Sequence, residues 1–137
     1  MVLDCPLCTA VGGELIWQNE FARVIFADEA AYPGFCRVVL NRHVAEMTDL
    51  NANERVELMN IVWAVEKTIR STLNPDKINL ACLGNMVPHL HWHIIPRWTN
   101  DQHFPAPIWA EAARQTSHTV DETVLMQLKQ QLAQLQP

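Results

Sequence analysis

The stretch His89-Leu90-His91-Trp92-His93-Ile94-Ile95 alternates histidine with apolar residues and then ends on two apolar residues. Successive side chains of a β-strand point to opposite faces of the sheet. The alternation therefore predicts a strand, with the three histidines in a row on one face and the intervening residues in the core. Neighbouring histidines on that face would be roughly 6.6–7 Å apart.

The segments on either side predict further strands and two helices. Four runs have the length and composition of strands: Glu14–Gln18, Phe21–Ala27, Phe35–Leu40 and Lys77–Leu83. Asn51-Ala52-Asn53-Glu54 has the spacing of a capping box. Apolar residues then recur at helical spacing and predict about five turns, which Asn74-Pro75 ends. A last amphipathic helix is predicted from the apolar spacing between Val124 and Leu135.

These elements predict an α+β fold, with an antiparallel sheet of about five strands, one long central helix and a C-terminal helix. The 137 residues fit one domain over 1–137, with a core at about 5–97 and an irregular tail and the last helix at 98–137. Trp17, Trp63 and Trp92 sit among apolar residues, so we expect them in the core.

Composition excludes several classes of function. The net charge is −5 and no run of Lys and Arg is present, which argues against a nucleic-acid partner. No apolar run is long enough to predict a membrane span, and the N-terminus lacks the pattern of a signal peptide. We therefore expect a cytoplasmic protein whose four cysteines are reduced thiols or metal ligands.

Three interpretations of the histidine row remain open from the residues alone. It is a polar strand face, or a three-histidine metal site, or a catalytic site. The metal site fits poorly, because three ligands along one straight strand do not converge on a tetrahedron. In the catalytic interpretation one neutral imidazole attacks an electrophile, and a neighbour stabilises charge or protonates the leaving group.

The histidine strand resembles the signature of the histidine triad (HIT) family. The similarity extends from about Cys5 to Arg97. Pro33-Gly34 with the strand after it, and then Asn41-Arg42-His43, are similar to the family's strand and the basic turn that follows it. Gly84-Asn85 resembles the loop that the family places beside the phosphate. The resemblance implies a small α+β unit, usually a homodimer, that acts on a purine nucleotide or dinucleotide.

The resemblance also implies the chemistry, which is cleavage or transfer at an α-phosphate in phosphoanhydride or phosphoramidate compounds. His91 would be the nucleophile and form a nucleotidyl-histidine intermediate. His93 would contact the phosphate and the leaving group, and His89 would support the row. Gly84 and Asn85 would bind phosphoryl oxygens, and catalysis would require no cofactor.

Two further positions are matched to substrate contacts by the same resemblance. Asp28 corresponds to an acid that accepts hydrogen bonds from ribose hydroxyls, although a solvated carboxylate in a turn is the alternative. Asn79 corresponds to a polar contact to ribose or phosphate, although it equally fits an amide at a strand edge. In the tail, Phe104 and Trp109 are weaker candidates for touching a ligand.

Two departures from the family pattern remove polar contacts near the triad. Phe35 stands where many members have a histidine, and Met86 stands where many have a hydroxyl donor to the phosphate. A thioether cannot donate a hydrogen bond. An alternative function is therefore a nucleotide-binding regulatory module with little or no catalysis.

Cys5-Pro-Leu-Cys8 has the spacing of half a zinc site, although two free thiols are the alternative. The resemblance implies that His43 and His89 complete a structural zinc site with this pair. A zinc-dependent hydrolase that uses the triad as ligands is a third possibility for function. Cys36 and Cys82 lie in apolar strands, and we expect both to be small core residues.

Overall fold

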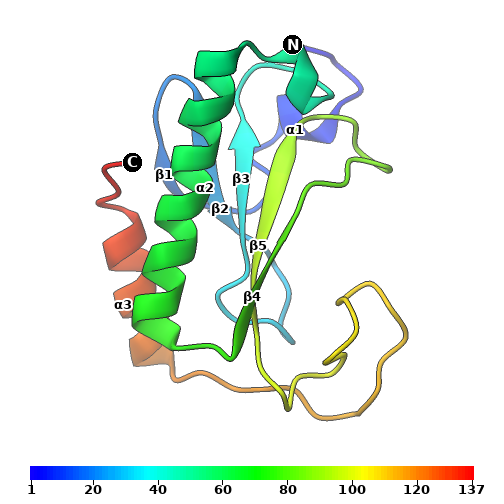
Figure 1. Cartoon of the computed structure of the whole chain (residues 1–137), viewed down its shortest axis with the longest axis vertical. Coiled ribbons are helices and arrows are strands. Elements are labelled where there is room, and N and C mark those ends of the chain that lie inside the picture. Colours follow the sequence, from blue (N-terminus) through cyan, green and yellow to red (C-terminus); the bar gives the residue numbers. More distant parts are fainter.

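The structure is a computed structural model that describes all residues, 1–137. Five strands form one sheet in the order β1-β2-β3-β5-β4, and every neighbouring pair is antiparallel. The strands are β1 (Glu14–Gln18), β2 (Ala22–Phe26), β3 (Cys36–Leu40), β4 (Lys77–Ala81) and β5 (His91–Arg97). The predicted α+β architecture is therefore confirmed (Figure 1).

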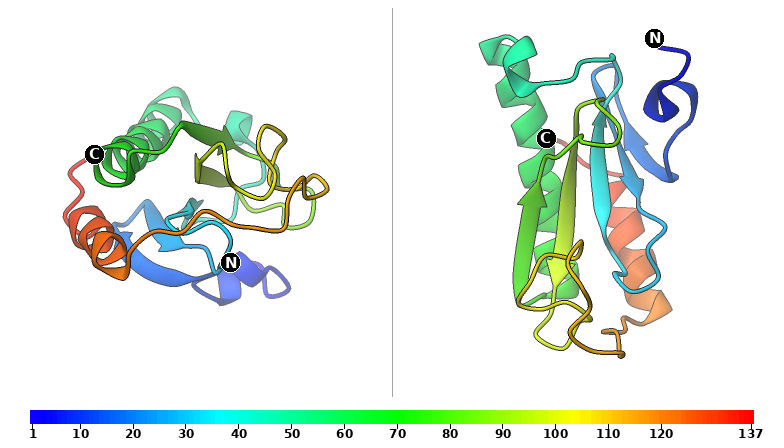
Figure 2. Two further views of the ribbon diagram at one scale, coloured as in Figure 1. Left: turned by 90° about the horizontal axis from the view of Figure 1, so that it is seen from below. Right: turned by 90° about the vertical axis from the view of Figure 1, so that its right-hand side faces the viewer.

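Two long helices cover one face of this sheet. They are α2 (Ala52–Leu73) and α3 (Glu122–Leu132), while α1 (Pro6–Thr9) and the 3-10 helix η1 (Met47–Asp49) are short elements that the sequence analysis did not predict. The main core lies between the sheet and the long helices, where Val24, Val38 and Ile94 meet Leu58 and Leu128. Figure 2 shows α2 and α3 together on this side, with the N-terminal segment and the tail on the other.

The long helix begins and ends as the sequence predicts. The Asn51 side chain accepts from the Glu54 N–H, and the Glu54 carboxylate accepts from the Asn51 N–H, each at 2.9 Å. This reciprocal pair satisfies donors that the first helical turn leaves free. Asn74 closes the helix in the left-handed conformation before Pro75. The 22 residues make about six turns, one more than predicted.

The turn before β3 requires glycine. Gly34 has a φ of +87°, and a Cβ there would lie 2.5 Å from Leu73 Cδ1. Residues with a side chain rarely adopt this conformation. The turn thus sets where β3 starts, and with it which residues of β3 face away from the helices.

Two expectations about strands and core differ from the structure. β5 begins at His91 and continues to Arg97, because the Leu90 N–H donates to the carbonyl of Val44 at 2.7 Å and not within a strand ladder. Trp63 was expected in the core but is 52% exposed, because it lies on the face of α2 that points away from the sheet. None of the helices has the length and apolarity needed to cross a membrane.

Candidate active site

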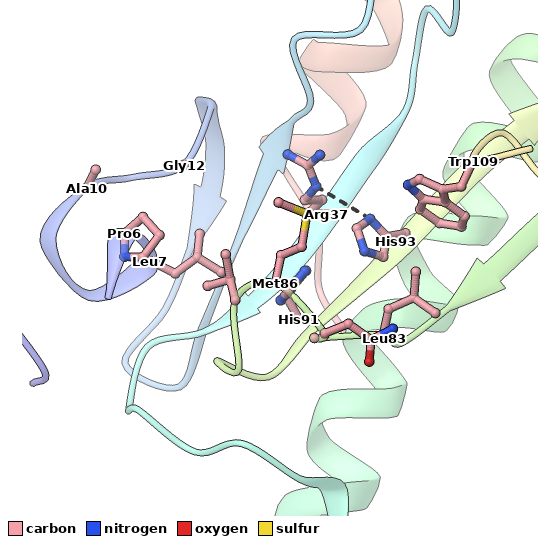
Figure 3. Close-up of a pocket in the computed structure, with 13 residues that line it drawn as sticks. Pro6, Leu7, Ala10, Gly12, Arg37, Leu83, Met86, His91, His93 and Trp109 are labelled. Carbon is pink, nitrogen blue, oxygen red and sulfur yellow. Dashed lines mark hydrogen bonds between the residues drawn. The ribbon is translucent and has the colours of Figure 1, made fainter. Parts of the chain in front are cut away.

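His91 and His93 of β5 lie on the sheet face opposite the long helices. Both are buried, and their ring centroids are 4.9 Å apart. They line a pocket of about 620 Å³, a size that suits a small organic ligand. In Figure 3 the two imidazoles lie beside Arg37 and Met86, with Leu7 on one side and Trp109 next to His93.

The position of the His91 proton is fixed by the backbone. Nδ1 lies 2.6 Å from the carbonyl oxygen of His89, so Nδ1 carries the hydrogen and donates it. Nε2 is then left with its lone pair. In the neutral form of the ring, that nitrogen can attack an electrophile.

The surroundings of His93 select the other tautomer and lower its pKa. Arg37 Nε donates to His93 Nδ1 at 3.4 Å, so the imidazole carries its hydrogen on Nε2. Phe35 and Trp109 pack against its ring, with centroids 5.7 and 5.1 Å away. Burial, and then the nearby charges of His91 and Arg37, lower the pKa of His93 to about 4. His93 is therefore neutral near pH 7.

His89 does not continue the row of histidines. It precedes β5, and its Nε2 donates to the carbonyl of Leu40 at 2.6 Å. Its Nδ1 faces Cys5 Sγ at 3.4 Å and Cys8 Sγ at 3.5 Å. His89 thus lies before the strand, and it belongs to the cluster with Cys5, Cys8 and His43 in which the sequence analysis also placed it.

That cluster consists of Cys5, Cys8, His43 and His89, whose ligand atoms all lie within 4.8 Å of one another. Cys8 Sγ is also 3.3 Å from His43 Nδ1. In a tetrahedral zinc site, bond lengths of about 2.3 Å to sulfur and 2.0 Å to nitrogen place a sulfur and a nitrogen roughly 3.5 Å apart. The donor types and their separations therefore fit a zinc ion. The bond from His89 Nε2 to Leu40 leaves Nδ1 free to be a ligand.

The predicted phosphate loop lies at the pocket. Gly84 and Asn85 both line it, and Gly84 has a positive φ of 79°. Met86 also lines the pocket and is 95% exposed. Phe35 is buried against Tyr32 and Ile95. Neither Phe35 nor Met86 has a side-chain donor that could replace the polar groups common in the family.

The structure does not bring Asp28 or Asn79 into the pocket lining. Asp28 is exposed after the end of β2. Asn79 Oδ1 accepts a hydrogen bond of 2.7 Å from Arg97. Their expected contacts with ribose stay predictions.

Two parts of the pocket were not predicted from the sequence. Arg37 is the only charged residue within the apolar run of β3, and that exception was a usable signal. Leu7, Ala10 and Gly12 form a wall that no local pattern indicates. Trp109 was named only as a weak candidate, while Phe104 lies near Arg97 and outside the lining.

Asp101 fixes the tail that carries Trp109. Its carboxylate accepts from Arg97 Nε at 2.8 Å and from the N–H groups of His103 and Phe104 at 3.0 and 2.7 Å. These bonds hold the pKa of Asp101 well below its usual range, against the opposing effect of burial. Arg114 donates to the Asp101 carbonyl at 2.6 Å. The tail is thereby held beside β5.

A family model described as "HIT domain" matches residues 11–100, about two thirds of the chain. The chain belongs to the HIT family. Among solved structures, it is similar to a histidine triad protein from Bradyrhizobium japonicum, with 30% identity, a TM-score of 0.71, and coverage of 87% of this chain and 88% of that one. A zinc-bound histidine triad family protein from Mycobacterium smegmatis shares the fold at 20% identity, with a TM-score of 0.68 and coverage of 96% and 95%.

The curated relatives that this chain matches are longer proteins. The chain is 33% identical over 78 residues to an AP-4-A phosphorylase of Mycobacterium tuberculosis, which covers 53% of this chain and 40% of that protein. It is 27% identical over 92 residues to an asymmetrical bis(5'-nucleosyl)-tetraphosphatase of Schizosaccharomyces pombe, covering 64% and 50%. The chain thus spans half or less of the length of these relatives.

Proposed function

We propose that this HIT protein is a nucleotide hydrolase or nucleotidyl transferase that acts at an α-phosphate through a covalent intermediate on His91. The observation that carries the proposal is the 2.6 Å bond from His91 Nδ1 to the carbonyl of His89, inside a pocket that also holds His93. It leaves Nε2 as a nucleophile at neutral pH. The named activities of the curated relatives, on AP-4-A and bis-nucleosyl tetraphosphate, belong to the same class of reaction.

The proposed reaction has two steps. His91 Nε2 attacks the α-phosphorus, forms an N–P bond and expels the leaving group with the electron pair of the broken bond. Water or another acceptor then attacks the same phosphorus and releases the nucleotide from His91. His93 Nε2–H, Asn85 and the backbone at Gly84 would bind phosphoryl oxygens, where negative charge increases in the transition state. Asp28 stays a proposed contact to ribose hydroxyls, and Asn79 a proposed contact to ribose or phosphate.

The test is to trap the intermediate. Wild-type protein, mixed with a dinucleoside polyphosphate and quenched in base, should gain the mass of one nucleotidyl group, while His91→Asn should gain none and lose turnover by about 10³-fold or more. Unchanged turnover by His91→Asn contradicts the proposal. Saturable AMP binding by the wild type without turnover or a trapped adduct supports the alternative, a regulatory nucleotide-binding module.

We also propose a structural zinc ion held by Cys5, Cys8, His43 and His89. The tetrahedral donor set supports it, and the similar M. smegmatis protein is described as zinc-bound. The ion would stabilise the fold by joining the N-terminal segment to the start of β5. The proposed chemistry at His91 requires no metal.

A homodimer and a cytoplasmic location complete the proposal. β4 is an edge strand with a free hydrogen-bonding edge, and α2 exposes Trp63 and Val56. Unpaired strand edges and exposed apolar side chains are typical of surfaces that associate. Four free cysteines agree with a reducing compartment.

A further inference from the structure

The pocket contains one strongly basic side chain, Arg37 of β3, and no carboxylate is paired with it. It is the only Lys or Arg among the lining residues. The ion pairs of the chain are formed by other residues, namely Arg42–Glu54, Arg97–Asp101 and Lys129–Glu14. Arg37 is half-buried, and a cation that is partly removed from water without a partner is destabilising. An anionic ligand in the pocket would remove that cost.

The protein positions the Arg37 side chain but leaves its terminal nitrogens free. Arg37 stands opposite His93 in the ladder between β3 and β5, and its Nε donates to His93 Nδ1 (Figure 3). The Phe35 ring lies beneath the guanidinium, with the centroid 5.1 Å from Cζ. Nη1 and Nη2 have no protein partner. Two N–H donors on one planar group match the geometry of a phosphate.

Three other positions in or beside the pocket supply no positive charge near pH 7. Phe35 and Met86 replace the polar residues that the family pattern has at those positions, and neither can donate. Burial keeps His93 neutral by lowering its pKa. Burial also lowers the pKa of Arg37, an effect that the charge of Glu29 opposes, but an arginine stays protonated in proteins. Arg37 is therefore the permanent cation of the pocket.

The choice of leaving group depends on Arg37 and His93. When His91 attacks, the electron pair of the broken bond stays on the leaving atom. An oxygen of a second phosphate can leave as an anion, because the second pKa of a phosphate is about 6. An amine must receive a proton as its bond to phosphorus breaks. Neutral His93 with a lowered pKa is a poor source of that proton, while Arg37 stabilises an anionic phosphate.

We infer that Arg37 is a specificity-determining residue that binds the phosphate next to the attacked one, so that the site prefers nucleoside polyphosphates to nucleoside phosphoramidates. The inference rests on the proposed function and names its substrate class. It assigns the cationic contact to a position on β3, whereas the loop that resembles the family's phosphate loop follows β4.

Calorimetric titration with AMP and with ADP tests the contact directly, because ADP adds one phosphate beside the α-phosphate. Wild-type protein should bind ADP about 10- to 100-fold more tightly than AMP, as expected for a charge-assisted hydrogen-bonded pair. Arg37→Met should abolish this preference and leave AMP affinity within about 3-fold, while Arg37→Lys retains part of it. Arg70→Met, an exposed arginine on α2, is the matched control and should behave as wild type.

Turnover gives the second readout. Arg37→Met should lower kcat/KM for diadenosine tetraphosphate by about 10- to 100-fold and for adenosine 5′-phosphoramidate by less than about 5-fold. Equal losses for both substrates, or for AMP and ADP, overturn the inference, as does no loss at all. If the wild type binds AMP and turns over through His91 but shows no preference for ADP, only the inference fails. If the wild type neither binds nor cleaves any of these compounds, the proposed function fails with it.

Discussion

Adjacent histidines of one motif differ because each contacts different backbone and side-chain groups. His91 donates to a backbone carbonyl, His93 accepts from Arg37, and His89 faces two thiols. An imidazole can be a nucleophile, a neutral donor or a metal ligand, and its hydrogen-bond partner selects the tautomer. The motif therefore supplies three equivalent side chains, and their partners make them unequal.

Burial of neutral His93 predicts a pH dependence of stability. Its pKa is about 4 in the folded protein and near 6.5 when unfolded, so the unfolded chain binds more protons between these values. Stability from this residue is present above about pH 6.5 and is lost as the pH falls towards 4. Urea unfolding at pH 7, 5.5 and 4.5 should show a steeper loss for wild type than for His93→Gln.

The expected difference between the two proteins over that range is on the order of 2 kcal/mol, after allowing for partial solvent screening of the site. The pKa of His89 is also lowered by burial, but its effect is common to both proteins. The contribution of Asp101 is lost only below about pH 4, where the carboxylate of the unfolded chain begins to be protonated while that of the folded protein stays ionised. Parallel curves for the two proteins would show that His93 is not held neutral.

At the scale of elements, the N-terminal segment is attached to the sheet by an arginine as well as by the cluster of Cys5, Cys8, His43 and His89. Arg23 of β2 donates to the carbonyls of Leu7 and Ala10 at 2.7 and 3.3 Å, and to that of Val11 at 3.0 Å. The segment is too short to form a stable helix alone. Its position as a pocket wall therefore depends on these contacts and on the cluster around Cys8.

Removal of one proposed zinc ligand should release this wall. We expect wild-type protein to contain about one zinc per chain by plasma mass spectrometry, and Cys8→Ser to lose it, because three ligands bind zinc far more weakly than four. AMP affinity should fall several-fold as the wall loosens, and the melting temperature should drop. Cys82→Ser is the control and should retain the metal. Purified wild-type protein that contains no zinc would contradict the metal proposal.

At the scale of the whole molecule, α2 and the edge strand β4 border the same side, away from the pocket wall (Figure 2). Trp63 and Val56 are seven residues apart on α2, about two helical turns, so they share one face. They are 52% and 58% exposed in the single chain. Burial of this face together with a paired β4 edge would join two sheets into one.

Sedimentation analysis tests this arrangement. Wild-type protein should sediment as a dimer, and Trp63→Glu should shift it towards monomer, because a carboxylate buried at the interface would lose its hydration. Met126→Glu, at a similarly exposed methionine on α3, should remain a dimer. A monomeric wild type would contradict the dimer. Equal effects of both substitutions would contradict an interface at Trp63.

The sequence alone determined the main strands and helices and indicated the histidines of the candidate site, because these follow from local spacing. Alternation predicted β5, the capping box predicted the start of α2, and the cysteine pair predicted half of the cluster with His43 and His89. The five-stranded antiparallel sheet followed from the same patterns. Errors fell at element ends, as at His89, whose backbone N–H donates to the carbonyl of Val87 and not across a strand ladder.

Only the tertiary structure decided which distant residues share the pocket. Arg37 meets His93 across 56 residues of chain, and Cys5 meets His89 across 84. Trp63 has apolar neighbours in the sequence, but the tertiary structure leaves it on the outward face of α2. Local periodicity describes one element at a time, whereas these contacts depend on strand order, register and the path of the tail. The histidines could therefore be identified from the sequence, while the charge beside them required the folded sheet.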